Sequence, residues 1–111
     1  MNIRKDIALA ISALAIASAY PQNSVAETFT SREFLTWSKE GQASYLHTAI
    51  GMAGLIAKRY EPTKGKCIDD WYFGEVTRSH DHIQIVMQEY PNYHPLGVVL
   101  AVLEKQCGKL R

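Results

Sequence analysis

The sequence lacks most of the motifs that mark a catalytic or cofactor-binding protein. It contains no G-x-S-x-G motif for a serine nucleophile and no glycine-rich phosphate-binding loop. Its only two cysteines, Cys67 and Cys107, do not have the C-x-x-C spacing of a typical zinc site. We therefore expect no catalytic residues, no metal ligands and no cofactor. A site assembled in space from distant residues is the open alternative.

An excess of charge is also missing. The chain has 12 basic and 11 acidic residues. Nucleic-acid-binding domains usually carry a basic patch, and many peripheral membrane proteins carry a polybasic segment. The balanced composition argues against both classes, so we expect no nucleic-acid partner and no polybasic attachment to a membrane.

Long apolar runs are absent after the first stretch of the chain. Residues 7–16 are almost entirely Ile, Leu and Ala, and the basic residues Arg4 and Lys5 precede them. This run is shorter than the roughly 20 residues that cross a bilayer, but it has the length and flanking charge of a signal-peptide core. We predict a signal peptide, and no membrane span once the signal has been removed.

Two positions fit the rule that small residues precede a signal-cleavage site. One follows Ala19 and the other follows Ala26. We favour cleavage after Ala26, because Pro21 breaks the helix a few residues upstream. The predicted organisation is a signal peptide over residues 1–26 and a mature exported domain over residues 27–111. An uncleaved membrane anchor or an ordinary N-terminal helix is the alternative.

The mature domain is small enough to need a stabilising cross-link. Removal of residues 1–26 leaves 85 residues, with ten basic and ten acidic side chains. A domain of this size buries proportionally little surface. In an oxidising compartment, an even number of cysteines indicates a disulfide. A Cys67–Cys107 bridge closes a loop of about 41 residues, for which loop entropy predicts roughly 4 kcal/mol of stabilisation. Two free thiols or a partial metal site are the alternatives.

Helical patterns predict a small all-α single domain of four or five short helices. Thr30 and Glu33 fit a capping box, which begins a short first helix that ends near Gly41. Residues 42–59 give the strongest helical pattern. The expected buried face of this helix contains residues at spacings of three and four: Tyr45, Ala49, Met52, Ala53 and Ile56.

Small residues in the same helix predict close contact with a neighbouring helix. Ala49, Ala53 and Ala57 form a strip along which another helix can approach. Gly51 and Gly54 each weaken a helix by about 1 kcal/mol relative to alanine. We therefore expect both glycines at close backbone contacts.

Turn residues and caps divide the rest of the chain. Pro62 and Gly65 predict a loop. Residues 67–73 follow as a short helix, and their aromatic and β-branched side chains leave a strand as the alternative.

The sequence pattern predicts two helices in the C-terminal part of the chain. The first covers residues 79–90 and stops before Pro91. The second begins with Pro95 in its first turn and ends at a C-cap, Gly108.

Three clusters are candidate sites. The segment His80–His82 resembles a metal site, but residues two apart do not share a helix face, and a further ligand such as His94 must come from elsewhere. The adjacent Asp69 and Asp70 point apart on a helix, which disfavours an acid–base pair. Tyrosine anchors many interfaces, so the Tyr93–His94 loop is a candidate binding surface.

The order of motifs resembles the Rap/Tai-like family. Residues 34–38, Phe-Leu-Thr-Trp-Ser, are similar to its Leu-Leu-x-Trp-Cys opening, and residues 45–57 are similar to its Gly-Tyr-Ile-x-Gly-x-x-Asp helix. Residues 67–68 resemble its Cys-hydrophobic-Pro segment. Residues 86–107 resemble its final part, a Tyr/His-Pro loop and an aliphatic helix ending in Cys. Ser38 replaces a family cysteine, so the resemblance implies that one of two family disulfides is lost.

The resemblance implies a function. Rap/Tai-like proteins are periplasmic immunity proteins that block peptidoglycan amidases delivered by type VI secretion. By this resemblance the chain is a non-enzymatic protein-binding domain whose partner is a cell-wall amidase, and a loop plugs the active-site cleft. The candidate loops lie around Lys64–Lys66, with Lys64 and Lys66 as contacts, and at Asn92, Tyr93 and His94. The sequence gives no oligomeric state.

Two other hypotheses stay open. The first is a periplasmic stress chaperone of the HdeA type, which is also small, helical and closed by one disulfide. Acid would protonate its carboxylates and histidines and open the domain. The second is a small hydrolase or metal-binding enzyme, which requires that His80, His82, His94 and a carboxylate share a pocket.

Overall fold

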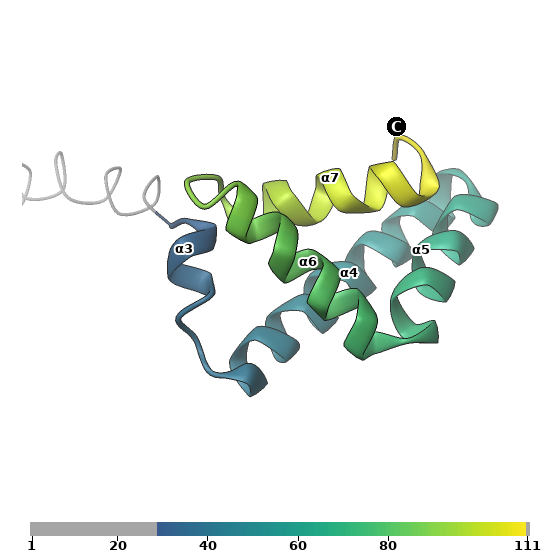
Figure 1. Cartoon of the computed structure of the whole chain (residues 1–111). Helices are drawn as coiled ribbons and strands as arrows, with labels where there is room; N and C mark the ends of the chain where they lie inside the picture. Colours follow the sequence, from purple (N-terminus) through teal and green to yellow (C-terminus); the bar gives the residue numbers. More distant parts are fainter. Residues whose placement is uncertain (1–28, 111) are drawn as a thin grey trace, which may run out of the picture.

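The described part of the chain is an all-α domain, which confirms the predicted fold class. A computed structural model describes residues 29–110, so the predicted signal peptide and both cleavage sites lie outside the described residues. Five helices follow one another in this range (Figure 1): α3 (Ser31–Phe34), α4 (Lys39–Tyr60), α5 (Pro62–Gly74), α6 (Val76–Glu89) and α7 (Pro95–Cys107). A search of residues 29–110 found no helix with the length and hydropathy of a membrane span.

Two hydroxyl caps make the first helix shorter than the sequence predicts. The Thr30 side chain accepts a hydrogen bond from the Glu33 N–H, as the capping motif predicts. However, α3 ends at Phe34 rather than near Gly41. A new helix starts after Ser38, because the Ser38 hydroxyl accepts the Gly41 N–H at 3.1 Å. Gly41 lies in the first turn of α4, so the predicted end of the first helix was wrong.

Helix α4 buries a different face from the predicted one. Its buried residues recur every three or four positions: Gln42, Leu46, Ile50, Gly54 and Ala57. The predicted core residues Met52 and Ile56 are instead 55 % and 50 % exposed. Tyr45 and Ala53, from the predicted face, do pack against the core. Because α4 is apolar on more than one side, spacing alone does not select the face that is buried.

Helices α4 and α5 approach each other closely at two glycines. A Cβ atom at Gly65 would collide with Lys58 and with the carbonyl oxygen of Gly54. A Cβ atom at Gly54 would collide with the Asp69 side chain. The predicted close contact is therefore confirmed for Gly54, but it was wrong for Gly51, where a Cβ atom would meet open space.

Helix α5 begins earlier than predicted and replaces the predicted loop. Pro62 occupies its first turn, where the missing N–H has no helical partner to lose. Glu61 alone separates α4 from α5 and serves as the cap of both. Lys64–Lys66 therefore lies within a helix, and the prediction of a loop there was wrong. Residues 67–73 are helical, so the strand alternative was also wrong.

Helices α6 and α7 lie close to their predicted bounds. Helix α6 begins at Val76 instead of Ser79 and ends at Glu89. Pro95 is the first residue of α7, and Gly108 follows its last residue with a φ of 86°. Since side chains disfavour a positive φ, a glycine is suited to this position. Both end signals of the last helix are confirmed.

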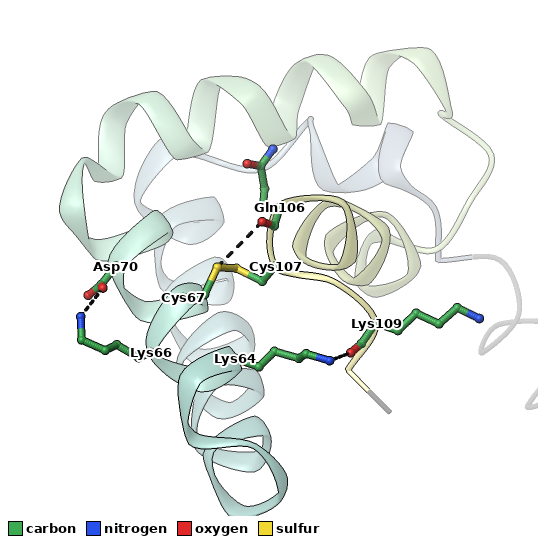
Figure 2. Close-up of a disulfide and its surroundings, with 7 residues drawn as sticks. All are labelled: Lys64, Lys66, Cys67, Asp70, Gln106, Cys107 and Lys109. Atoms are coloured by element: carbon green, nitrogen blue, oxygen red, sulfur yellow. Dashed lines mark hydrogen bonds and ion pairs between the residues drawn. A yellow bond between two sulfur atoms is a disulfide. The ribbon is translucent and has the colours of Figure 1, made fainter.

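The predicted disulfide is present and joins α5 to the end of α7 (Figure 2). The Cα atoms of Cys67 and Cys107 are 5.9 Å apart, which is within the usual range for a bridge. The core of the domain draws on all five helices: Phe34, Leu46, Ile50, Ile68, Tyr72, Ile83, Met87, Val99 and Leu103. The disulfide therefore adds a covalent link at the end of α7 to a core built by packing.

Candidate functional site

The two predicted lysines lie near the disulfide, and each is paired within the domain (Figure 2). Lys64 forms an ion pair with Glu61 at 2.9 Å and donates a hydrogen bond to the Lys109 carbonyl. Lys66 contacts Asp70 at 2.6 Å, and the hydrogen bond and charge of this carboxylate raise the pKa of Lys66. Both lysines thus belong to the surface of a helix rather than to a loop that enters a partner's cleft.

The predicted loop Asn92–His94 is present between α6 and α7. The Ser31 N–H donates a hydrogen bond to the Tyr93 carbonyl at 2.8 Å, and the Arg32 side chain donates to the Asn92 side chain at 3.0 Å. These bonds hold the loop against α3. The Tyr93 side chain remains 63 % exposed, so the loop presents an aromatic ring from a fixed backbone.

These two predicted segments lie at opposite ends of α7. The helix begins directly after His94 and ends at Cys107, which is bonded to α5 (Figure 1). Thirteen helical residues at about 1.5 Å each span about 20 Å. The structure therefore does not bring Lys64–Lys66 and Asn92–His94 to one binding surface.

Four aromatic rings form a cluster where the described chain enters the domain: Phe29, Phe34, Trp37 and Tyr45. Their centroids are 5.1 to 6.3 Å apart in five stacked, tilted or edge-to-face pairs. Such pairs each add about 0.5–1.5 kcal/mol beyond the burial of their surface. Phe34 is fully buried, whereas Trp37 is 40 % exposed, so this aromatic cluster fixes an indole ring at the surface.

An open apolar groove of about 730 Å³ lies beside the aromatic cluster. It is lined by residues of α4, by the residue before its cap and by the first turn of α7: Trp37, Gly41, Ser44, Tyr45, Thr48, Ala49, Met52 and Leu96. None of these eight residues carries a charge. We call this surface the α4 groove.

The α4 groove is the feature that the sequence pattern did not predict. Helical spacing placed Met52 in the core, where it would not line a surface. A usable signal was present in the uncharged run from Gly41 to Ala57, which contains no Asp, Glu, Lys or Arg. A helix with one buried face needs uncharged residues on that face only. An uncharged run over almost five turns therefore indicates a second apolar face.

Tyr72 joins two histidines from neighbouring helices. Its fully buried side chain comes from α5, and its hydroxyl lies 2.7 Å from His47 Nδ1 on α4 and 2.5 Å from His80 Nε2 on α6. Burial raises the pKa of Tyr72 to about 12. Burial, followed by the charge of His47, lowers the pKa of His80, and Asp81 partly opposes this shift. We call this contact the His47–Tyr72–His80 bridge.

The two histidines of the predicted metal-like segment, His80 and His82, contact different parts of the domain. The His80 ring belongs to the bridge, whereas the His82 ring packs edge-on against Trp71 with centroids 6.1 Å apart. His94 caps α7 by accepting the Leu96 N–H at 3.1 Å. Within residues 29–110, no group of three or more His, Cys, Asp or Glu residues is placed to hold a metal ion.

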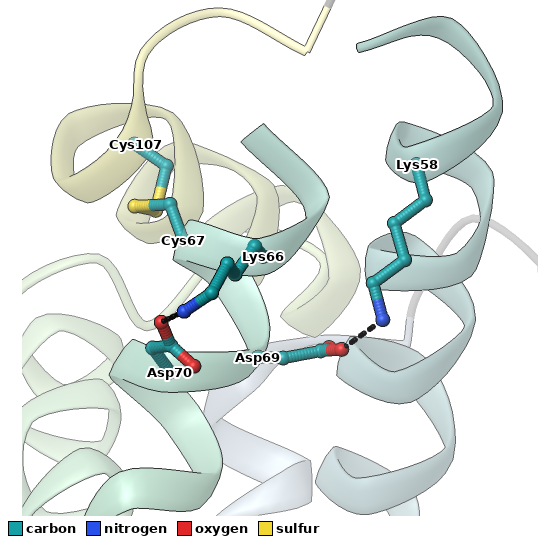
Figure 3. Close-up of polar contacts among 6 residues, drawn as sticks. All are labelled: Lys58, Lys66, Cys67, Asp69, Asp70 and Cys107. Carbon is teal, nitrogen blue, oxygen red and sulfur yellow. Dashed lines mark hydrogen bonds and ion pairs between the residues drawn. A yellow bond between two sulfur atoms is a disulfide. The ribbon is translucent and has the colours of Figure 1, made fainter. Parts of the chain in front are cut away.

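The adjacent carboxylates Asp69 and Asp70 face different partners (Figure 3). Asp69 contacts Lys58 on α4 at 2.6 Å, whereas Asp70 contacts Lys66 on its own helix at 2.6 Å. The first pair helps to join α4 to α5. The two carboxylates therefore do not share a proton, in line with the prediction that they point apart.

Comparisons of this chain with protein-family models, with curated proteins and with solved structures found no match. The Rap/Tai-like resemblance therefore stays a prediction, and the function is argued from the geometry of the described residues.

Proposed function

We propose that this chain is an exported, non-enzymatic domain that binds another protein in the periplasm. The observation that carries the proposal is the α4 groove, an exposed surface of aromatic and aliphatic side chains. Ligand and partner sites are typically concave and mostly apolar, as this groove is. The groove lies on helices rather than on a free loop, so its shape is set before a partner binds.

The side chains of the α4 groove are of the types that anchor interfaces. Trp37, Met52 and Leu96 are each about half exposed. Covering them removes apolar area from water, at about 25 cal/mol for each Å². Aromatic residues and methionine are enriched in interface cores. Because the aromatic cluster already fixes Trp37, little side-chain entropy is lost when a partner covers it.

The Asn92–His94 loop extends this surface. The His94 ring lies edge-on to Phe29 at 5.3 Å, and Phe29 in turn stacks on Trp37. Leu96, two residues after His94, lines the α4 groove itself. We therefore assign Asn92–His94 to the binding surface and leave Lys64–Lys66 out of it.

The proposed partner is a peptidoglycan amidase, as the Rap/Tai-like resemblance implies. Inhibition is steric in this proposal: the domain covers the active-site cleft and supplies no chemistry of its own. The uncharged α4 groove would take an apolar loop or helix face beside that cleft. The exposed Tyr93 ring would contact the partner at the edge of the interface.

The test uses the immobilised chain to capture proteins from a periplasmic extract, and then measures the affinity for the recovered protein. Met52→Glu places a carboxylate inside the α4 groove. We expect it to weaken binding about 30-fold or more, as for a hot-spot residue worth about 2 kcal/mol. Leu55→Glu is the matched control, because Leu55 is exposed on the same helix but does not line the groove.

Recovery of an amidase that the chain inhibits and the Met52→Glu variant does not inhibit would support the proposal. Capture of unfolded proteins alone would count against it. Equal loss of binding in the Met52→Glu and Leu55→Glu variants would remove the α4 groove as the docking surface.

A further inference from the structure

The His47–Tyr72–His80 bridge shares one hydroxyl between two ring nitrogens. The hydroxyl has a single hydrogen, so it donates to one imidazole and accepts an N–H from the other. His47 Nδ1 lies at 2.7 Å and His80 Nε2 at 2.5 Å, so both contacts have hydrogen-bond length. With both histidines neutral, the Tyr72 hydroxyl and the two ring nitrogens that face it are all paired.

Protonation of the histidines changes the balance of hydrogen-bond donors and acceptors in two steps. A first proton makes one imidazole a cation, which donates to the Tyr72 oxygen while the hydroxyl still donates to the neutral imidazole. A second proton leaves two N–H donors aimed at one oxygen and leaves the hydroxyl hydrogen without a ring acceptor. It also places two cations in rings whose centroids are 5.7 Å apart. The bridge therefore stays fully paired with one added proton, whereas two added protons bring like charges together and leave the hydroxyl hydrogen without a partner in the bridge.

The charges around the bridge do not compensate for a second proton. Lys39 of α4 and Asp81 of α6 line a cavity of about 180 Å³ together with His80, and their charges are opposite. From α5, the bridge meets the neutral ring of Phe73, which lies edge-on to His47 at 5.8 Å.

At the junction of α5 and α6, the nearby carboxylate is already paired. Glu75 contacts Arg78 at 3.4 Å, within the first turn of α6. Burial of His80, with the charge of His47, lowers the pKa of His80 more than Asp81 raises it. A histidine whose pKa is lowered in the folded chain stabilises the fold above its ordinary pKa of about 6.5, and this stabilisation is lost as the pH falls.

The bridge matters most for the position of α6. Helix α5 is held to α4 by the close contact of Gly54 and Gly65, and it is held to α7 by the disulfide. Helix α6 has no covalent link of this kind within the described residues. Its other polar contact with α4 is the Gln84–Gln42 hydrogen bond at 2.8 Å. The buried Ser79 hydroxyl also bonds to the carbonyl oxygens of Trp71 and Tyr72 on α5. Loss of the bridge therefore loosens the contact of α6 with α4, while α5 stays joined to α4 and α7.

We propose that the His47–Tyr72–His80 bridge is a proton-operated latch, which holds α6 against α4 at neutral pH and releases it when both histidines are charged. His47 is exposed and His80 is partly buried, so solvent protons reach the latch without unfolding of the domain. The released part is the N-terminal half of α6, which carries His80 and the core residue Ile83. This inference is independent of the proposed partner.

The test compares the opening of α6 at pH 7.5 and at pH 5 by amide hydrogen exchange of the purified chain, corrected for the intrinsic rate at each pH. We expect the opening constant of α6 amides to rise several-fold at pH 5, with little change in α5. His80→Gln removes the second proton site, and we expect a clearly smaller rise. His82→Gln is the matched control on the same helix, because His82 is outside the bridge.

Ring signals of the four histidines, followed by NMR through the same pH range, give a second readout that does not depend on the stability of a variant. We expect the titration of His80 to depend on the charge of His47, and this dependence to weaken in Tyr72→Phe. If α6 opens as steeply in His80→Gln as in the unchanged chain, or if His80 titrates independently of His47, the latch is overturned.

Discussion

The Phe29 ring stacks on the Trp37 indole, with centroids 5.4 Å apart and planes inclined by 19°. Phe29 also lies edge-on to Tyr45 and to His94. One side chain at the start of the described chain therefore links the aromatic cluster, the edge of the α4 groove and the loop before α7.

Phe29→Ala is expected to lower the free energy of unfolding by about 1.5–4.5 kcal/mol, because three ring contacts at about 0.5–1.5 kcal/mol each are lost. It should also weaken partner binding, since Trp37 is no longer fixed. Urea unfolding followed by circular dichroism measures the first effect. Tyr93→Ala is the control, because Tyr93 has one ring contact, with Tyr90, and should cost less. Equal costs for the two variants would show that the stack contributes little.

Two glycine substitutions separate close packing from helix propensity. Gly65→Ala should destabilise the domain by about 1–3 kcal/mol, the usual cost of overpacking, because the new methyl group meets Lys58 and the Gly54 backbone. Gly51→Ala should stabilise it by up to about 1 kcal/mol, because its methyl group meets open space within α4. Thermal unfolding of both variants checks the opposite signs. A stabilising Gly65→Ala would contradict the close approach of α4 and α5.

Removal of the disulfide should cost about 2–4 kcal/mol of stability. The paired variant Cys67→Ala with Cys107→Ala tests this by urea unfolding. The unchanged chain in a reducing agent is the control, and it should lose about the same amount. A loss in the variant but not in the reduced chain would point to the substituted side chains rather than to the covalent link.

Tyr72 predicts a loss of stability in alkaline solution. Burial raises its pKa from 10.0 to about 12 in the folded chain, so the unfolded chain ionises first. The stabilisation is therefore complete below about pH 10 and is lost as the pH rises towards 12. Urea unfolding at several pH values should show this loss in the unchanged chain and a shallower one in Tyr72→Phe. Burial also raises the pKa of Tyr45, so Tyr45→Phe serves as the comparison variant.

The acid-chaperone hypothesis predicts a different result from the partner-binding proposal. At about pH 3, below the ordinary pKa values of carboxylates, a chaperone of this type binds a hydrophobic dye and protects other proteins from aggregation. We expect opening of α6 but no such protection, because the proposed function requires a folded α4 groove. Light scattering of an aggregating client protein, with and without the chain, distinguishes the two. Protection at pH 3 that is absent at pH 7 would favour the chaperone.

Capping residues in the sequence correctly predicted several helix ends, because a helix end depends on contacts between residues close in the chain. Thr30, Pro95 and Gly108 have the predicted cap positions, because a cap bonds to atoms within a few residues of itself. Pro62 misled the prediction, since proline occurs both in loops and in the first turn of a helix. Only the packing of Gly65 against α4 decides between these two structures.

The candidate site was less predictable than the fold. The Asn92–His94 loop was found because prolines flank it in the sequence. The α4 groove was missed because α4 has two apolar faces and spacing cannot rank them. The bridge was missed because His47 and Tyr72 are 25 residues apart, and the pattern of each helix gives no indication of which polar atoms meet across the interface.

The position of Cys107 as the last residue of α7 sets the order of events when the protein is made. Synthesis runs from the N-terminus, so every other residue of the five described helices exists before the second sulfur does. The glycine contact between α4 and α5 is therefore available long before any covalent closure. The bond between Cys67 and Cys107 cannot guide the early assembly of α3 to α6. Oxidation joins the last helical residue of the described chain to α5, so the covalent link closes the domain at the end of its last helix.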